Sequence, residues 1–124
     1  MYNYTVIGHY TARILQAKVL KTKISELQKS GPVVCTGDFN AEPTSETYSE
    51  MIKLLKDAKT VAEKSDEGIT FHNYGKVKEG TAGPIDYIFV TENIKVSSYR
   101  IIRNTVKNMY PSDHYPVASD VVFK

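Results

Sequence analysis

The chain has 124 residues, 41% of them hydrophobic and 24% charged, with a formal net charge of +2. This length fits one domain, and the ordinary composition excludes collagen-like, low-complexity and strongly disordered proteins. No apolar run approaches the roughly 20 residues of a membrane-spanning helix, and the small charge excess is too weak to argue for nucleic acid as a partner. A single cysteine, Cys35, excludes an internal disulfide and a cysteine-rich zinc site.

The first half of the chain predicts a helix, a strand and a second helix. Apolar residues at helical spacing predict a helix over residues 10–29. The β-branched run at residues 32–36 predicts a strand buried on both faces. Thr44 or Ser45 is expected to cap a second amphipathic helix that reaches about Lys56.

The second half predicts mainly strands. Residues 59–83 are polar and contain glycine, which indicates a loop with one short strand candidate at residues 69–71. Three further strands are expected over residues 85–91, 96–103 and 115–123. The order of helix, strand, helix and three strands indicates an α+β fold in which helices cover a sheet.

Polar residues concentrate in two loops beside strands and at one position inside a strand. Asp38 and Asn40 follow the first strand, and Asp113 and His114 precede the last one. Asp86 lies in an otherwise apolar strand, where a carboxylate is costly unless it is paired. His114 is its expected partner, because an Asp–His pair fixes the imidazole tautomer and raises its basicity. The oxygens of Asp38, Asp113 and Asn40 suit Mg²⁺ or Mn²⁺.

Structural explanations compete with these functional ones. Asp38 and Asn40 also fit a simple turn after a strand, and Asp86 also fits a structural acceptor for a neighbouring backbone N–H. His9 and His72 are expected to be surface or loop histidines. Cys35 is expected to be a small buried hydrophobe and not a nucleophile.

Three motifs follow one another along the chain. They are Gly37-Asp38-Phe39-Asn40-Ala41-x-Pro43, Ile85-Asp86-Tyr87-Ile88-Phe89-Val90 and Tyr110-Pro111-Ser112-Asp113-His114-Tyr115-Pro116-Val117. In this order and spacing they resemble the endonuclease/exonuclease/phosphatase (DNase I-like) superfamily, and the resemblance covers residues 12–123. It implies a four-layer αββα sandwich and a divalent metal that helps to cut phosphate esters.

The resemblance also implies a role for each site residue. His114 would be the general base that activates water, and Asp86 would orient it. Asp38 would hold the water or protonate the leaving group, and Asn40 would donate a hydrogen bond to the phosphate. Asp113 and Asp38 would bind Mg²⁺ or Mn²⁺.

The chain departs from the family in length. A family domain is about twice as long, and its N-terminal half supplies an asparagine, a metal-binding glutamate and one sheet. Residues 1–124 are therefore expected to form one incomplete domain: a partial αββα sandwich with one sheet, helices on its outer face and no N-terminal half. A Thr-His pair of the family has no counterpart at the same position in residues 4–9, where His9 comes later.

The missing half has consequences for partners. Removal of one sheet exposes an apolar face that a soluble monomer rarely tolerates. The chain is therefore expected to be a fragment, to pair with a second copy or a complementing chain, or to be a degenerate remnant.

The first functional interpretation is a metal-dependent phosphoester hydrolase in which His114 activates the attacking water. The alternative is a catalytically inactive remnant or subunit that binds a partner chain or a phosphorylated ligand. A nucleic-acid-binding module is a third option, which the thin charge excess disfavours. The substrate class stays open, nucleic acid included. So does the compartment, although the cytoplasm is favoured because no signal peptide is visible.

Overall fold

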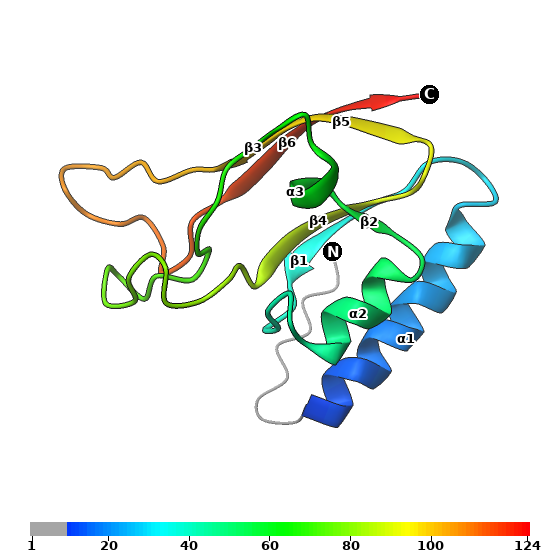
Figure 1. Cartoon of the computed structure of the whole chain (residues 1–124), viewed down its shortest axis with the longest axis horizontal. Coiled ribbons are helices and arrows are strands. Elements are labelled where there is room, and N and C mark those ends of the chain that lie inside the picture. Colours follow the sequence, from blue (N-terminus) through cyan, green and yellow to red (C-terminus); the bar gives the residue numbers. More distant parts are fainter. Residues whose placement is uncertain (1–9) are drawn as a thin grey trace.

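The computed structural model describes residues 10–124, which form layers of helices and sheets (Figure 1). Two helices lie next to one sheet, and a second sheet and a short helix lie beyond it. In chain order the elements are α1 (Tyr10–Leu27), β1 (Val34–Asp38), α2 (Glu46–Ile52), β2 (Lys56–Asp57), α3 (Ala58–Val61), β3 (Lys64–Ser65), β4 (Asp86–Val90), β5 (Ile94–Ile101) and β6 (Val117–Phe123).

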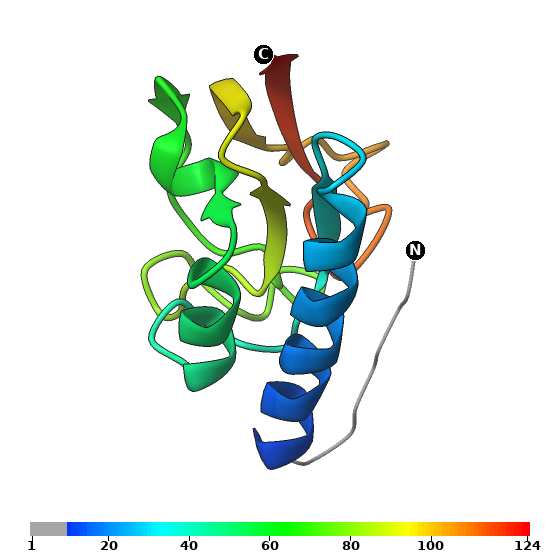
Figure 2. The ribbon, with the colours of Figure 1, turned by 90° about the vertical axis from the view of Figure 1, so that its right-hand side faces the viewer.

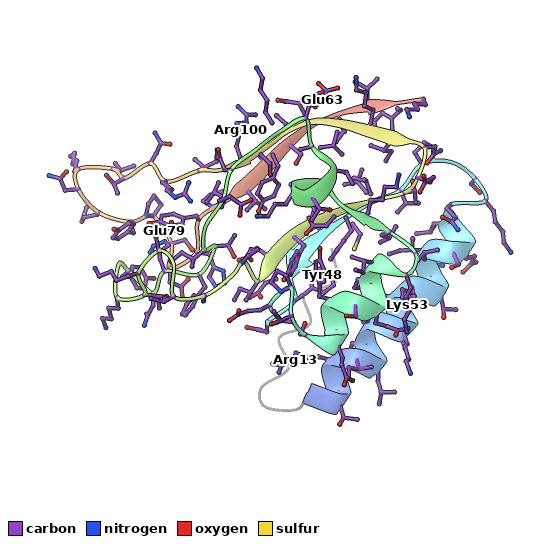
Figure 3. All side chains as sticks on the ribbon, viewed as in Figure 1. Arg13, Tyr48, Lys53, Glu63, Glu79 and Arg100 are labelled. Carbon is purple, nitrogen blue, oxygen red and sulfur yellow. The ribbon has the colours of Figure 1, made fainter. Side chains whose placement is uncertain are left out.

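The two longer helices pack against each other and against the first sheet (Figure 2). α1 buries Ala17 and Ile24, which lie two turns apart on one face. Ser45 caps α2, because its hydroxyl accepts a hydrogen bond from the Tyr48 N–H at 3.1 Å. Tyr48 points from α2 toward the sheet (Figure 3), and its hydroxyl donates to the buried Asp57 carboxylate at 3.0 Å.

The first sheet has the order β1–β4–β2, with both neighbours antiparallel to β4. The prediction that α2 reaches Lys56 is wrong. α2 ends at Ile52, and Lys56 and Asp57 pair with β4. The prediction that the strand at 32–36 is buried on both faces is also wrong. β1 is an edge strand whose Val34 is 41% exposed, and none of its five residues is fully buried.

β4 is the central strand of the fold. Its side chains alternate between two cores, as a pleated strand requires. Tyr87 and Phe89 pack against the helices, whereas Ile88 and Val90 pack against the second sheet. This strand therefore joins both layers, and its first residue, Asp86, lies at the edge of both.

The second sheet has the order β3–β5–β6, with β3 parallel and β6 antiparallel to β5. Its core includes Val96, Tyr99 and Ile101, together with Ala58 of α3. The expected α+β class is confirmed. The strands form two small sheets, and a turn closed by a hydrogen bond from the Ile94 N–H to the Thr91 carbonyl links β4 of the first sheet to β5 of the second.

None of the helices within residues 10–124 combines the length and the apolar character that a bilayer crossing requires.

Cys35 of β1 gives a test of this packing. Burial raises the pKa of its thiol to about 11, so very little of it is thiolate near neutral pH. We predict that iodoacetamide at pH 8 modifies Cys35 roughly a hundredfold more slowly in the folded chain than in the chain unfolded by urea. Mass spectrometry over time gives both rates, and equal rates would contradict the packing of β1 against the helices.

Candidate active site

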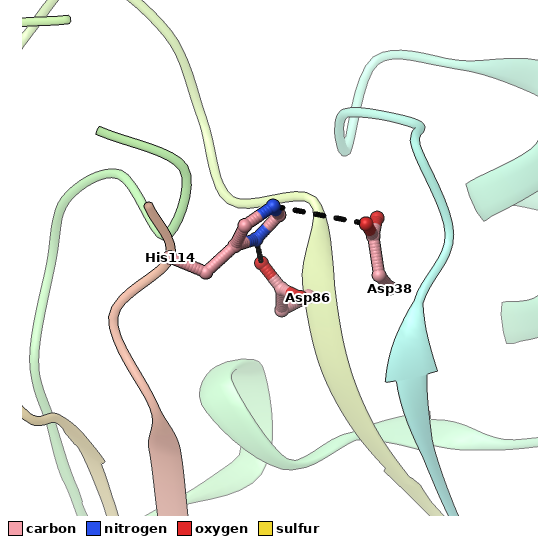
Figure 4. Close-up of side chains that lie close together, drawn as sticks. All are labelled: Asp38, Asp86 and His114. Atoms are coloured by element: carbon pink, nitrogen blue, oxygen red, sulfur yellow. Dashed lines mark hydrogen bonds and ion pairs between the residues drawn. The ribbon is translucent and has the colours of Figure 1, made fainter. Parts of the chain in front are cut away.

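Two of the predicted site residues face each other because their strands are antiparallel. Asp38 ends β1, Asp86 begins β4, and the two are direct partners in the register of the sheet. His114 comes from the segment before β6, where its backbone bridges to Phe71. Three segments that are far apart in the sequence therefore bring Asp38, Asp86 and His114 together (Figure 4).

The imidazole of His114 lies between the two carboxylates. Its Nδ1 is 2.8 Å from Oδ2 of Asp86, and its Nε2 is 3.9 Å from Oδ2 of Asp38. An ionised carboxylate only accepts hydrogen bonds, so Nδ1 donates to Asp86. In the neutral ring, Nε2 then carries the free lone pair on the side of Asp38.

The site is partly open to solvent. The exposed fractions of the three side chains are 18% for Asp86, 26% for His114 and 29% for Asp38. Small molecules can therefore reach Nε2 of His114 and the Asp38 carboxylate.

The surroundings shift the pKa values of two of these groups. Burial lowers the pKa of His114, but the hydrogen bond and charge of Asp86, followed by the charges of Asp38 and Asp113, outweigh burial and raise it. Burial raises the pKa of Asp38, and the N–H of Asn40 opposes that rise only in part. Both groups therefore hold a proton more readily than they do in water.

Asn40 is connected to the cluster through its backbone. Its N–H donates to Oδ1 of Asp38 at 2.8 Å, and its φ of 47° lies in the left-handed region that asparagine tolerates. Asp38 and Asn40 therefore do form a turn after the strand, as the structural explanation expected. The same turn orients the Asp38 carboxylate that faces His114.

Asp113 lies next to the cluster and not within it. Its backbone carbonyl accepts hydrogen bonds from the N–H groups of His72 and Asn73, at 3.0 and 3.1 Å. Its carboxylate accepts a bond of 3.3 Å from the Ser112 hydroxyl. The charge of Asp113 contributes to the raised pKa values of His114 and Asp38, so it adds to the field of the site.

The donor atoms of the cluster fit a divalent cation. One ligand atom from each of Asp38, Asp86 and His114 lies within 4.8 Å of the other two. Two carboxylates supply the hard oxygen ligands that Mg²⁺ and Mn²⁺ prefer. Asp113, expected as a ligand together with Asp38, is outside this group of three.

Two residues near the site differ from what the sequence indicates. His72 is in a loop, as expected, but it is 1% exposed, with its ring 4.0 Å from that of Tyr115 and 4.5 Å from that of Tyr110. The prediction of a strand at residues 69–71 is wrong: Phe71 forms only an isolated bridge with His114, and Thr70 is fully buried against the start of β4. No local pattern indicates the burial of His72, because its partners are distant in sequence. His9 lies outside the described residues.

Comparison with known proteins identifies the family of the chain. The model of the Endonuclease/Exonuclease/phosphatase family matches residues 3–114. No curated protein matches the chain. Solved structures do match it.

An endonuclease/exonuclease/phosphatase from Bacteroides vulgatus is 30% identical, with a TM-score of 0.83, over 93% of this chain and 45% of its own. A Bacteroides thetaiotaomicron mannosyl-6-phosphatase is 29% identical, with a TM-score of 0.82, over 94% of this chain and 48% of its own. The human Nocturnin catalytic domain is 22% identical, with a TM-score of 0.73, over 98% of this chain and 45% of its own, and this likeness shows the fold. The chain thus spans less than half the length of each of these neighbours, and it belongs to the endonuclease/exonuclease/phosphatase family.

Proposed function

We propose that the chain carries the water-activating part of a phosphoester hydrolase site. The observation that carries this proposal is the position of the His114 ring, which is bound at Nδ1 by Asp86 and faces Asp38 through Nε2. A ring held in this way has one free nitrogen that can take a proton from water as the water attacks phosphorus.

Each residue of the cluster has a separate task in this mechanism. Nε2 of His114 accepts the proton, and Asp86 stabilises the imidazolium that results. Asp38 holds the water or returns a proton to the leaving oxygen. Asn40 donates a hydrogen bond to the phosphate as negative charge develops on it.

A divalent ion, Mg²⁺ or Mn²⁺, is part of the proposal. Asp38 would hold it, together with Asp113, the partner that the sequence indicates, or with Asp86, the second carboxylate within reach of Asp38. When bound, the ion would neutralise charge on the phosphate.

Sugar phosphates are the substrates to try first. The Bacteroides thetaiotaomicron neighbour is a mannosyl-6-phosphatase and is 29% identical to this chain. Mannose 6-phosphate therefore comes first, followed by diester substrates, nucleic acid included.

The first test removes the general base. We predict that the chain hydrolyses p-nitrophenyl phosphate or its bis ester in the presence of Mn²⁺, and that His114→Ala lowers kcat by about 100-fold or more. Release of p-nitrophenol measures the rate. Asp120→Ala is the matched control, because Asp120 is an exposed charged residue of β6 that is not part of the cluster.

The alternative function predicts a different result. If the folded chain binds Mn²⁺ and inorganic phosphate but shows no turnover, the proposed hydrolase function is wrong. The result would then favour an inactive subunit or remnant. Circular dichroism of both variants confirms that the substitutions leave the fold intact.

A groove beside β1 supports the proposal of a partner chain. It has a volume of about 630 Å³ and lies between α1 and β1, with Ala17, Leu20, Ile24, Val33, Cys35 and Phe39 in its wall. Among residues 10–124, β1 is hydrogen-bonded to one strand, β4. Within residues 10–124, the buried Nε of Arg13 and the buried hydroxyl of Thr47, both at this groove, find no hydrogen-bond partner.

We propose that a second copy of this chain covers the groove. An edge strand can pair with its own copy about a twofold axis, because the same surface then serves both partners. The neighbours are about twice as long as this chain, so a second copy also has the size of the polypeptide that it lacks relative to them. Such pairing would satisfy the free edge of β1 and cover apolar side chains.

The mass in solution tests this pairing. We predict a mass of twice 13.9 kDa by light scattering after size exclusion. Val19→Glu should halve the mass, because Val19 is 67% exposed at the groove, whereas Val106→Glu, at a residue that is 60% exposed elsewhere, should not. A well-behaved monomer for the unmodified chain would overturn the pairing.

A further inference from the structure

The segment from Ile69 to Asn73 holds the segment before β6 that carries His114. The N–H of Tyr115 donates to the carbonyl of Thr70 at 2.7 Å, and the N–H of His72 donates to the carbonyl of Asp113 at 3.0 Å. The rings of Phe71 and His114 lie 5.1 Å apart, centre to centre. Both the backbone and the ring of His114 are thus placed by this segment.

The Thr70 side chain binds the other partner of the pair. Its hydroxyl oxygen accepts hydrogen bonds from the N–H of Ile85 at 2.9 Å and from the N–H of Asp86 at 3.2 Å. Thr70 is fully buried, so water does not compete for these bonds. One residue is therefore bonded to the segment of His114 through its carbonyl and to the start of β4 through its hydroxyl.

This bridge matters because no sheet sets the distance between the two segments. Asp86 begins β4 of the first sheet, whereas His114 lies outside both sheets and is bridged only to Phe71. Asp86 and His114 are 28 residues apart, yet their contact is 2.8 Å long. A hydrogen bond of this kind is lost with a shift of about 1 Å, and catalytic geometry is equally sensitive.

We propose that Thr70 is a positioning residue that sets the contact between Asp86 and His114. This inference rests on the proposed function in so far as that contact prepares His114 to activate water. The hydroxyl is the part of Thr70 that acts, because it alone bonds to the N–H groups at the start of β4.

Three substitutions separate positioning from stability. Thr70→Val keeps the shape and removes the hydroxyl, whereas Thr70→Ser keeps the hydroxyl. Thr91→Val is the matched control: Thr91 is also buried, follows the other end of β4, and accepts a hydrogen bond from the N–H of Val33 at 3.0 Å. It lies away from the site, so it reports the cost of losing a buried threonine hydroxyl alone.

We expect Thr70→Val to lower kcat by about 10- to 100-fold with little change in KM. Amide hydrogen exchange at Ile85 and Asp86 should become faster in the same variant. Thr70→Ser should restore both properties, and Thr91→Val should leave kcat unchanged. If Thr70→Val does not fold, Thr70→Ala compared with Thr70→Ser provides the same test.

A second measurement keeps the inference separate from the proposed function. The ring signals of His114 and their NMR contact with the Phe71 ring should change in Thr70→Val, but not in Thr70→Ser or Thr91→Val. If the unmodified chain shows no turnover, the proposed function fails, and these signals alone decide the role of Thr70. Unchanged His114 signals in Thr70→Val, or a kcat within twofold of the original value, would overturn the inference.

Discussion

The hydrogen bond between His114 and Asp86 is the interaction on which the site depends. Asp86 begins a strand whose next four residues are buried, so its carboxylate needs a partner at that position. The imidazole is that partner at 2.8 Å, and the same bond leaves Nε2 free on the side of Asp38. One contact therefore stabilises the end of β4 and prepares the chemical group that the proposed reaction uses.

The position of β4 explains why the site lies where it does. β4 contributes alternate side chains to both cores, so its end is fixed by packing on two sides. β1 is antiparallel to it, which brings Asp38 opposite Asp86. β1 has no second neighbour among residues 10–124, however, and the groove beside it leaves the Asp38 side of the site less enclosed than the Asp86 side. The proposed partner chain would complete this less enclosed side.

Sequence patterns predicted α1, α2, β1, β4, β5 and β6 and the pairing of Asp86 with His114, because hydrophobic periodicity and motif order carry that information. They missed β2, α3 and β3, and the strand expected at residues 69–71 is only an isolated bridge at Phe71. They did not predict features that depend on contacts between distant segments. The early end of α2 follows from pairing of Lys56 with β4, and the burial of His72 follows from two tyrosine rings. The role of Asp113 as a metal ligand stays a prediction.

Binding of Mn²⁺, followed by NMR, tests the central claim most directly, because the paramagnetic ion broadens signals of nearby nuclei. The account predicts that substoichiometric Mn²⁺ broadens amide signals next to Asp38, Asp86 and His114 first, and that Mg²⁺ in excess restores them. Broadening centred elsewhere on the surface, or none at these three residues, would contradict the claim that they form one site.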